Sequence, residues 1–280
     1  MFLVKQKKNL NSSTVMIKIE APKIANKARP GQFVIIRADE NSERLPLTIA
    51  GYDSQKGTVT VIFQTVGVST MKLSEVPEGG YISDIVGPLG RASELDGIKK
   101  AVVIGGGLGC AIAYPQAKYL HENGASVDII AGFRNRDVII LEDEMKAVCD
   151  NLTLLTDDGS NGNKGLVTDG LKSLVESGKD YDIAIVIGPP IMMKFVSMLT
   201  KEYGIKTIVS MNPIMIDGTG MCGGCRVSVG GEMKFACVDG PDFDGHLVDF
   251  DKLIKRNSMY REEEQESCNL FRAAKELNNG

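Results

Sequence analysis

One stretch of the chain reads Ala101-Val102-Val103-Ile104-Gly105-Gly106-Gly107-Leu108-Gly109-Cys110, an uninterrupted apolar run followed at once by a cluster of glycines. Such a run is typical of a strand that is buried on both faces of a parallel sheet. The glycines resemble the G-x-G-x-x-G turn, in which the backbone approaches a pyrophosphate and the next helix offers free N–H groups. The stretch therefore predicts a nucleotide-binding strand–turn–helix, with a tight turn that binds no ligand as the alternative.

The same rhythm of strands and helices continues through residues 98–210. Further buried strands are expected at Val127–Ile130, Leu152–Thr156, Ile183–Ile187 and Thr207–Val209. Helices are expected between them, at residues 111–123, 142–148, 168–176 and 192–202. Strands and helices that alternate in this way predict a doubly wound parallel sheet.

The residues that follow these strands are the candidates for binding NAD(H). Parallel strands end at one edge of their sheet, and open α/β folds bind ligands there. The candidates at this edge are Gly105, Gly106, Gly107, Gly109, Cys110, Arg134, Asp157, Gly188 and Pro189. Arg134 is placed to meet an adenosine ribose or its 2′-phosphate, so the choice between NADH and NADPH stays open. Cys110 has a second interpretation, as a small residue in a crowded turn.

The first 97 residues have the pattern of β-structure. Strands rich in β-branched residues are expected at Val15–Ile19, Gln32–Ile36 and Val59–Phe63. Short strands at this spacing predict a small antiparallel barrel. Two segments suit a flavin dinucleotide, because Arg44–Thr48 sets a guanidinium near a hydroxyl and Gly67–Thr70 lies at a strand–helix junction. Without context, each is also an ordinary surface turn.

A ligand pattern lies near the C-terminus, in Asp217, Cys222, Cys225 and Cys237. The spacing is that of a plant-type [2Fe-2S] loop, with aspartate in place of the first cysteine. The intervening glycines suit a loop that wraps a cluster, because such a loop needs positive φ angles. A zinc site and unmetallated thiols are the alternatives. Cys149 and Cys268 lack ligand spacing and are interpreted as ordinary thiols.

Composition and charge exclude several classes of partner and location. The chain of 280 residues is long enough for two or three domains, and its net charge of −4, with no basic stripe, argues against a nucleic-acid partner. No apolar run approaches the roughly 20 residues that span a bilayer, and charge enters at Lys5, too early for a signal peptide. With reduced cysteines besides, we expect a cytoplasmic protein. The polar tail, residues 257–278, is expected to be a solvated helix, with docking onto a partner subunit as the alternative.

Three motifs carry a resemblance to a known group of proteins. They are Arg44-x-Pro46-Leu47-Thr48, Gly87-Pro88-Leu89-Gly90 and Gly105-Gly106-Gly107, in this order and ahead of the cysteine loop. Together they resemble the ferredoxin reductase superfamily, and within it most of all the electron-transfer subunit of dihydroorotate dehydrogenase. Two positions depart from that subunit, because Leu45 stands where arginine is frequent and Asp217 replaces the first cluster cysteine.

The second departure points to a closer family. The loop Asp217-Gly218-Thr219-Gly220-Met221-Cys222-Gly223-x-Cys225 is followed by Cys237-Val238-Asp239-Gly240-Pro241-x-Phe243-Asp244-Gly245-His246. Together they resemble the small (alpha) subunit of NADH-dependent reduced ferredoxin:NADP oxidoreductase, a family also known as the sulfide dehydrogenase small subunit. In that family the aspartate ligates iron, FAD lies in the barrel and NADH binds the small subunit. The large subunit carries a second flavin and further clusters and performs electron bifurcation with ferredoxin.

The resemblance implies a heterodimeric enzyme's subunit that exchanges a hydride between NAD(H) and FAD. It also implies that single electrons pass through the [2Fe-2S] cluster to or from a larger flavin and iron–sulfur subunit. The three units become an FAD-binding barrel (1–97), an NAD(H)-binding domain (98–210) and a cluster domain with its tail (211–280). The implied cluster ligands are Asp217, Cys222, Cys225 and Cys237, and no catalytic side chain is implied. The implied FAD contacts are Arg44, Leu45, Pro46, Leu47, Thr48, Ile62, Phe63, Gln64, Gly67, Ser69 and Thr70. A dihydroorotate dehydrogenase electron-transfer subunit and a zinc-containing, non-redox nucleotide-binding module are the alternatives.

Overall fold

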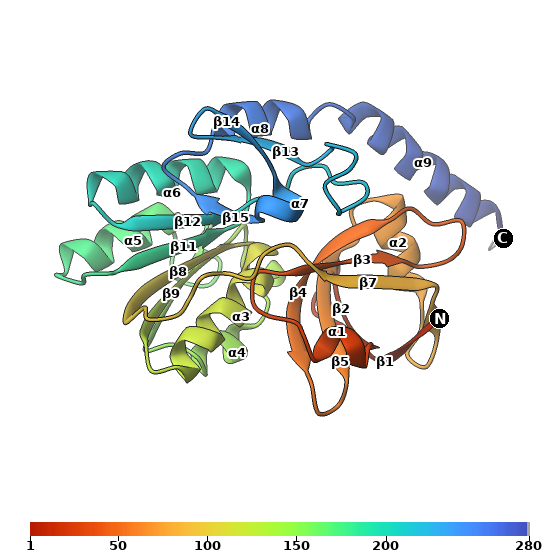
Figure 1. Ribbon diagram of the computed structural model, residues 1–280, viewed down its shortest axis with the longest axis horizontal. Coiled ribbons are helices and arrows are strands. Elements are labelled where there is room, and N and C mark those ends of the chain that lie inside the picture. The colour runs from red at the N-terminus through yellow and green to blue at the C-terminus, as the bar shows by residue number, and fades with distance from the viewer. Residues whose placement is uncertain (279–280) are drawn as a thin grey trace.

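The computed structural model describes residues 1–278, and its first unit is a β-barrel (Figure 1). Its seven antiparallel strands follow the order β6-β1-β2-β5-β4-β3-β7. They are β1 (Phe2–Asn9), β2 (Thr14–Glu20), β3 (Phe33–Arg37), β4 (Leu45–Asp53), β5 (Thr58–Gln64), β6 (Tyr81–Ile82) and β7 (Asp84–Leu89), accompanied by the helices α1 (Pro22–Ala25) and α2 (Val68–Glu75). Ile17, Val61 and Phe63 are among the β-branched and aromatic side chains that fill the core. The predicted antiparallel barrel is confirmed.

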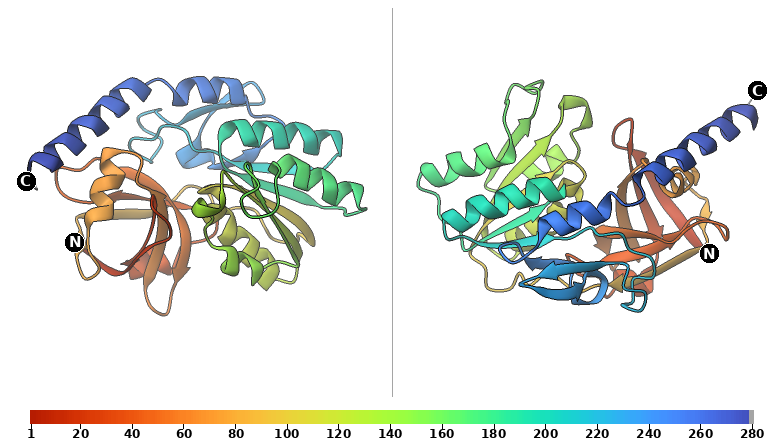
Figure 2. Two further views of the ribbon diagram at one scale, coloured as in Figure 1. Left: turned by 180° about the vertical axis from the view of Figure 1, so that it is seen from behind. Right: turned by 90° about the horizontal axis from the view of Figure 1, so that it is seen from above.

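The second unit is a sheet of parallel strands with helices on both faces (Figure 2). Its parallel strands are β8 (Lys100–Gly106), β9 (Ser126–Phe133), β10 (Asn151–Thr156), β11 (Ile183–Ile187) and β12 (Lys206–Ser210). The helical segments are α3 (Gly109–Glu122), η1 (Arg136–Val138), α4 (Glu142–Lys146), α5 (Val167–Glu176) and α6 (Pro190–Glu202). One buried cluster lies under α3 and α4 and another under α5 and α6. The order β10-β9-β8-β11-β12 confirms the doubly wound sheet and places its reversal between β8 and β11.

The third unit contains the cysteine loop and joins the second through a strand. Its elements are β13 (Arg226–Val229), β14 (Glu232–Phe235), α7 (Ala236–Asp239), β15 (Asp242–Asp244), α8 (Phe250–Asn257) and α9 (Arg261–Asn278). Strand β15 pairs antiparallel with β12, so the edge of the predicted parallel sheet is mixed. The boundary drawn at residue 210 therefore separates two strands that pair with each other, and the three-domain division stays a prediction.

The C-terminal helix α9 runs away from the cysteine loop along one side of the barrel (Figures 1 and 2). Most of its side chains are exposed, as expected for a solvated helix, but two anchor it to the barrel. The Cys268 sulfur is buried 3.6 Å from the carbonyl oxygen of Val66, and Lys275 forms an ion pair with Glu75. Over the described part of the chain, no helix combines the length and apolarity that crossing a membrane would require.

The buried carboxylate of Asp242 ties the three units together. The hydroxyl of Ser93, on the segment that leaves the barrel, donates to Asp242 Oδ2 at 2.5 Å, and Ser210 of β12 lies opposite Asp242 in the register of the two strands. Gly31 of the barrel lies so close that a Cβ there would stand 2.1 Å from Ser93 Oγ. Within residues 1–278, Asp242 Oδ1 is buried without a hydrogen-bond partner. Burial therefore raises the pKa of Asp242.

We expect Asp242→Asn to gain stability relative to the native chain as the pH rises. Since folding raises the pKa of this carboxyl, its contribution is fully present below the unfolded pKa of about 4 and is lost as the pH rises through the folded pKa. Asparagine keeps an uncharged hydrogen-bonding group at the same place. Thermal unfolding of both proteins from about pH 4 to about pH 8 measures the difference in Tm. A difference that does not change with pH would contradict a titrating, buried Asp242.

Candidate functional site

The cysteine loop, residues 217–225, folds together with the turn at Cys237. The loop reverses its direction at glycines with φ angles of +75°, +85° and +67°, which are Gly218, Gly220 and Gly223. Few residues other than glycine adopt such angles without strain. The sulfurs of Cys225 and Cys237 are buried 3.2 Å apart, whereas Cys222 is exposed. The loop thus leaves the Cys222 sulfur exposed and places the Cys225 sulfur beside that of Cys237 on α7.

Backbone N–H groups point at two of these sulfurs. Gly224 N–H donates to the Cys222 sulfur at 3.3 Å, and Cys237 N–H donates to the Cys225 sulfur at 3.4 Å. Hydrogen bonds to cluster sulfurs are one of the means by which a protein sets the potential of an iron–sulfur site. The loop therefore offers sulfur donors that are already supported by backbone dipoles.

The Asp217 carboxylate is turned toward the N–H groups of its own loop. Asp217 Oδ1 accepts from the N–H of Thr219 at 3.1 Å, and Oδ2 accepts from those of Met221 at 3.2 Å and Cys222 at 3.0 Å. The bond from Thr219 is the largest cause that holds the pKa of Asp217 below its usual range. The carboxylate is therefore ionised, as a metal ligand must be, and stands beside the first cysteine of the loop.

The four predicted ligands lie in two pairs, Cys225 with Cys237 and Asp217 beside Cys222. Among the described residues, no three or more His, Cys, Asp or Glu side chains converge as around a single metal ion. A [2Fe-2S] cluster has two irons, each of which takes two protein ligands. Two adjacent pairs of donors on a glycine-rich loop therefore fit this cluster, while the role of each residue as a ligand stays a prediction.

The cysteine pair packs directly against the barrel. Cys225 and Cys237 belong to one buried cluster with Phe33 and Ile35 of β3. The cysteine loop itself also lies close to β3, because a Cβ added to Gly218 would stand 3.1 Å from the Ile35 side chain. Strand β3 pairs with β4, which is the strand of the predicted flavin segment. Residues 33 and 35 carry no sequence signal for this role, because their spacing only predicts a strand.

Arg44 connects the flavin segment to the cysteine loop. Its guanidinium is exposed, and Nη2 donates to the carbonyl oxygen of Asp217 at 3.3 Å. Thr48, four residues further on β4, is half-buried and lies opposite Phe33 in the register of the two strands. The two polar groups predicted to meet a flavin therefore lie close to the residues that contact the cysteines.

The predicted FAD contacts on β5 differ in exposure. Ile62 and Phe63 are both buried, on opposite faces of the strand, in two different cores. Only their backbone groups are therefore available to a ligand, whereas the Gln64 side chain is partly exposed. The sequence could not predict which of these three side chains is exposed, because the burial of a strand residue depends on which other elements cover the strand.

At the start of α2 the predicted hydroxyls already have partners. Ser69 Oγ donates to the Glu43 carboxylate at 2.6 Å, and Thr70 Oγ1 accepts from the N–H of Gly67 at 3.0 Å while donating to its carbonyl at 2.8 Å. The Gly67-x-x-Thr70 spacing is that of a helix cap, which is the signal for the second contact. Glu43, in an exposed loop, was not predicted.

The predicted NAD(H) contacts come together at one edge of the sheet. Gly105 and Gly106 are the last residues of β8, and Gly188 directly follows β11. The two strand ends lie close together, because a Cβ added to Gly188 would stand 3.1 Å from Gly106 N. Arg134 and Asp157 are exposed just after β9 and β10, the next two strands. The residues thus line the carboxyl ends of four neighbouring strands around the reversal point, where open α/β sheets bind ligands.

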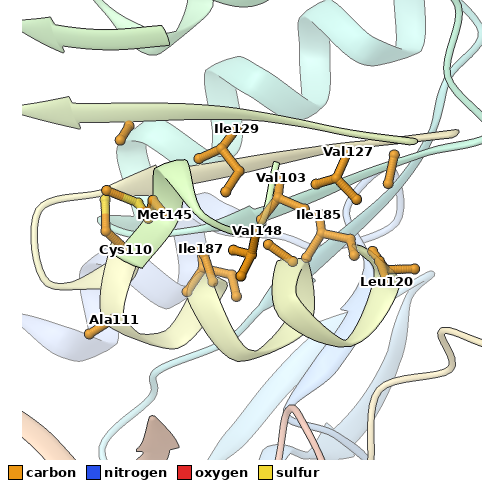
Figure 3. Packing of buried hydrophobic residues seen from close by; sticks show 14 of the residues in the cluster. Val103, Cys110, Ala111, Leu120, Val127, Ile129, Met145, Val148, Ile185 and Ile187 are labelled. Atoms are coloured by element: carbon orange, nitrogen blue, oxygen red, sulfur yellow. The ribbon is translucent and has the colours of Figure 1, made fainter. Parts of the chain in front are cut away.

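Cys110 is the candidate that does not face this edge. Its side chain is fully buried and lies within the cluster under α3, near Met145 (Figure 3). A Cβ added to Gly105 would stand 2.7 Å from the Cys110 sulfur, so the Cys110 side chain packs against the glycine turn. Burial raises the pKa of this thiol to about 12. The geometry favours the packing interpretation over a thiol beside the nicotinamide.

We expect Cys110 to resist alkylation in the folded protein while Cys222 reacts. A thiol with a pKa of about 12 has almost no thiolate near pH 8, and thiolate is the reactive form. Iodoacetamide labelling of the metal-free chain, followed by mass spectrometry, measures both rates in one sample, and addition of a denaturant provides the control. Equal labelling of Cys110 and Cys222 before unfolding would show that the buried position is wrong.

Comparison with known proteins identifies the family. The model for the "iron-sulfur cluster binding domain of dihydroorotate dehydrogenase B" matches residues 212–249, which include the whole cysteine loop. A Thermotoga maritima protein described as a "dihydroorotate dehydrogenase B (NAD(+)), electron transfer subunit homolog" is 48% identical over 253 residues, which are 90% of this chain and 89% of that protein. The chain belongs to the family of dihydroorotate dehydrogenase B electron transfer subunits and their homologues. A Clostridium beijerinckii protein from the region 3′ of adh is also similar, with 54% identity over 272 residues, 94% of this chain and 92% of that protein.

A solved structure extends the comparison within the electron transfer subunit family. It is that of NADH-dependent reduced ferredoxin-NADP oxidoreductase, reported for flavin-based electron bifurcation. One of its chains is 44% identical, with a TM-score of 0.91 and coverage of 97% of this chain and 98% of that one. The predicted fold, the class of flavin and iron–sulfur oxidoreductase subunit, and the set of FAD, NAD(H) and [2Fe-2S] are thereby confirmed at the level of the family. As an electron transfer subunit, the chain works with a partner subunit.

Proposed function

We propose that the chain is the NADH-linked small subunit of an electron-bifurcating oxidoreductase. It exchanges a hydride between NAD(H) and FAD and passes single electrons through its cluster to or from a larger flavin and iron–sulfur subunit that works with ferredoxin. The observation that carries this proposal is the packing of Cys225 and Cys237 against β3, the neighbour of the flavin strand β4. The 44% identity to the bifurcating structure supports the choice within the family.

The barrel residues bind and orient the flavin in this proposal. Bound FAD supplies the link between two-electron and one-electron chemistry. The Arg44 guanidinium neutralises its pyrophosphate, together with the N-terminus of α2 at Gly67. Because Arg44 also donates to the Asp217 carbonyl, it holds the cysteine loop at the flavin strand. Thr48 is the hydroxyl on that strand proposed to hydrogen-bond the ring.

The sheet edge holds the nicotinamide nucleotide. Gly106 and Gly188 let β8 and β11 end close together at the reversal point, because a Cβ at Gly188 would stand 3.1 Å from Gly106 N. The helix α3 directs its N-terminus to this point and offers its N–H groups to the pyrophosphate. Arg134 and Asp157 then meet the adenosine half over β9 and β10. The helix α3 also packs on the barrel, since Ala50 and Ile62 share its buried cluster, so the nucleotide edge and the flavin strand are held in fixed relation.

The cluster ligands are Asp217, Cys222, Cys225 and Cys237 in this proposal. Thiolate ligands require a reducing compartment before assembly, which supports the cytoplasm. A subunit of dihydroorotate dehydrogenase itself is the second candidate, because the matching domain and the T. maritima relative bear that name. Asp217 counts against this second candidate, because it stands where the dihydroorotate dehydrogenase subunit has its first cluster cysteine. Purification of the native complex discriminates the two by whether the partner is a larger iron–sulfur flavoprotein or a dihydroorotate-oxidising enzyme.

The test of the proposal is an anaerobic visible spectrum of the purified chain before and after addition of NADH, with iron and zinc quantified. Flavin and [2Fe-2S] absorbance that bleaches with NADH is the expected result. A colourless protein that contains zinc would overturn the redox function. A coloured protein that NADH does not bleach would overturn the assignment of the sheet edge to NAD(H).

We expect Asp217→Cys to keep the cluster but to shift its potential by some tens of millivolts. A carboxylate is a harder ligand than a thiolate, so it balances the two iron oxidation states differently, and about 60 mV corresponds to a tenfold change in a one-electron equilibrium. Redox titration followed by EPR measures the shift relative to the native chain. An unchanged potential and an unchanged EPR spectrum would remove Asp217 from the ligand set.

A further inference from the structure

Asp242 is a buried acid on β15, the strand that Figure 1 shows beside β12 at the junction of the three units. The Ser93 hydroxyl donates to its Oδ2 at 2.5 Å, whereas its Oδ1 is buried without a hydrogen-bond partner among residues 1–278. A buried carboxylate that keeps its charge requires partners for both oxygens. A bound proton therefore gives Asp242 the uncharged form that suits this place.

No positive charge compensates this carboxyl in the part of the chain that the structure describes. Burial is the largest cause of its raised pKa, and no charged group is among the causes. Arg91, two residues before Ser93, lies 3.9 Å from the Asp239 carboxylate instead. The charged side chains on the segments packed against Asp242 are all at least partly exposed, and they are Arg29, Arg91, Glu94, Asp239 and Asp244. The proton affinity of Asp242 therefore responds directly to a charge that is added nearby.

The buried cysteine pair lies close to this carboxyl. Gly31 of the barrel packs on Asp242, since a Cβ added there would stand 3.2 Å from Oδ2. Phe33, two residues further along the chain, and Phe243, next to Asp242, both pack with the cysteine pair. Two residues of extended chain span at most about 7 Å. The carboxyl and two of the proposed cluster ligands are therefore separated by one short segment of the barrel.

An electron that enters a cluster held by these cysteines adds a negative charge to the junction. At a separation on the order of 10 Å and an effective dielectric constant of about 20, one added charge changes the proton affinity of a carboxyl by roughly tenfold. Because the added charge is negative, it favours the protonated acid and raises the pKa of Asp242 further. By reciprocity, a proton on Asp242 favours reduction of the cluster to the same extent.

We propose that Asp242 binds one proton when the cluster takes up one electron. The proton comes from solvent and forms an O–H bond on the carboxyl, and it returns to solvent when the electron leaves. The junction as a whole then gains no net charge on reduction. The inference rests on the proposed function, since it takes the cysteine loop as the site of an electron-carrying cluster.

The experiment measures the reduction potential of the cluster in the full chain, by redox titration followed by EPR, from about pH 5 to about pH 9. In the native chain the potential is expected to fall as the pH rises between the pKa values of the oxidised and the reduced protein. The fall is at most about 59 mV per pH unit, because a tenfold lower proton concentration makes the coupled reduction tenfold less favourable. Asp242→Asn, which keeps an uncharged amide at this place, is expected to have a potential that does not change with pH. Glu94→Gln is the matched control, because it removes an exposed carboxyl next to Ser93 and is expected to keep the native dependence on pH.

A second variant, Ser93→Ala, tests the same carboxyl without replacing it. Its hydroxyl no longer stabilises the charged carboxylate, so Asp242 holds its proton more tightly and the fall in potential moves to higher pH. Infrared difference spectra of the reduced and oxidised chain give a second readout. The C=O band of a protonated carboxylic acid is expected to grow when the native chain is reduced, and to be missing from the difference spectrum of Asp242→Asn.

Two outcomes would overturn the inference. A native chain whose cluster potential does not change with pH would show that reduction binds no proton. An Asp242→Asn chain that keeps the native dependence on pH would assign the proton to another group. Failure of the proposed function is distinguishable from both, because the native chain would then give no EPR signal of a reduced cluster at any pH.

Discussion

Replacing Cys237 with alanine is expected to abolish assembly of the [2Fe-2S] cluster while NADH still bleaches the flavin. Cys237 is buried with its sulfur 3.2 Å from that of Cys225, so its loss leaves one proposed iron with a single protein ligand. We expect the iron content to fall from about two per chain to near zero, and the EPR signal of the reduced protein to disappear. The nucleotide edge at Gly106 and the flavin strand β4 do not include this residue, so hydride exchange between them persists.

The matched control for this variant is Cys149→Ala. Cys149 is half-buried behind α4 in the nucleotide unit and has no proposed role, so the control keeps its iron and its EPR signal. Anaerobic reconstitution with iron and sulfide, followed by metal analysis, measures both variants. A Cys237→Ala protein that retains two irons would remove Cys237 from the ligand set, and zinc in the native chain would favour the zinc module.

The fold was predictable where local pattern and burial coincide. The run Ala101–Ile104 is apolar because β8 is covered on both faces, and Ile183–Ile187 repeats the pattern in β11. Strand β15 could not be predicted in the same way. Its three residues, Asp242–Asp244, are two acids around one phenylalanine, which is too short a pattern to indicate a strand. Their pairing with β12 is supported by tertiary contacts such as the bond from Ser93.

The candidate site shows the same division. The spacing of Cys222 and Cys225 is local, so sequence indicated the loop, and the family match confirmed an iron–sulfur domain there. The contact between the cysteine pair and Ile35 joins residues nearly two hundred positions apart, and no spacing reveals it. Phe63 was predicted as an FAD contact, yet its side chain fills the barrel core, so only its backbone remains available.

Replacing Gly109 with alanine is expected to destabilise the nucleotide unit by about 3 kcal/mol or more and to weaken NADH binding. A Cβ at this position would stand 2.2 Å from the carbonyl oxygen of Ile187 and 2.9 Å from the Cα of Gly188. Both are backbone atoms, which cannot rotate away as a side chain would. Either α3 or β11 must therefore shift at the point where the two halves of the sheet diverge, and Gly188 belongs to the proposed NAD(H) edge.

The matched control is Gly107→Ala in the same turn. Gly107 has a φ of +56°, and a Cβ there would meet nothing within 4 Å, so alanine carries only the strain of the left-handed conformation, about 1–2 kcal/mol. Denaturant unfolding gives the free energy of both variants, and titration with NADH compares the Gly109→Ala chain with the native one. The argument requires the larger loss of stability at Gly109, because only there does the new carbon collide with β11. Equal losses at the two positions would mean that conformational strain, and not the spacing between α3 and β11, makes glycine necessary in this turn.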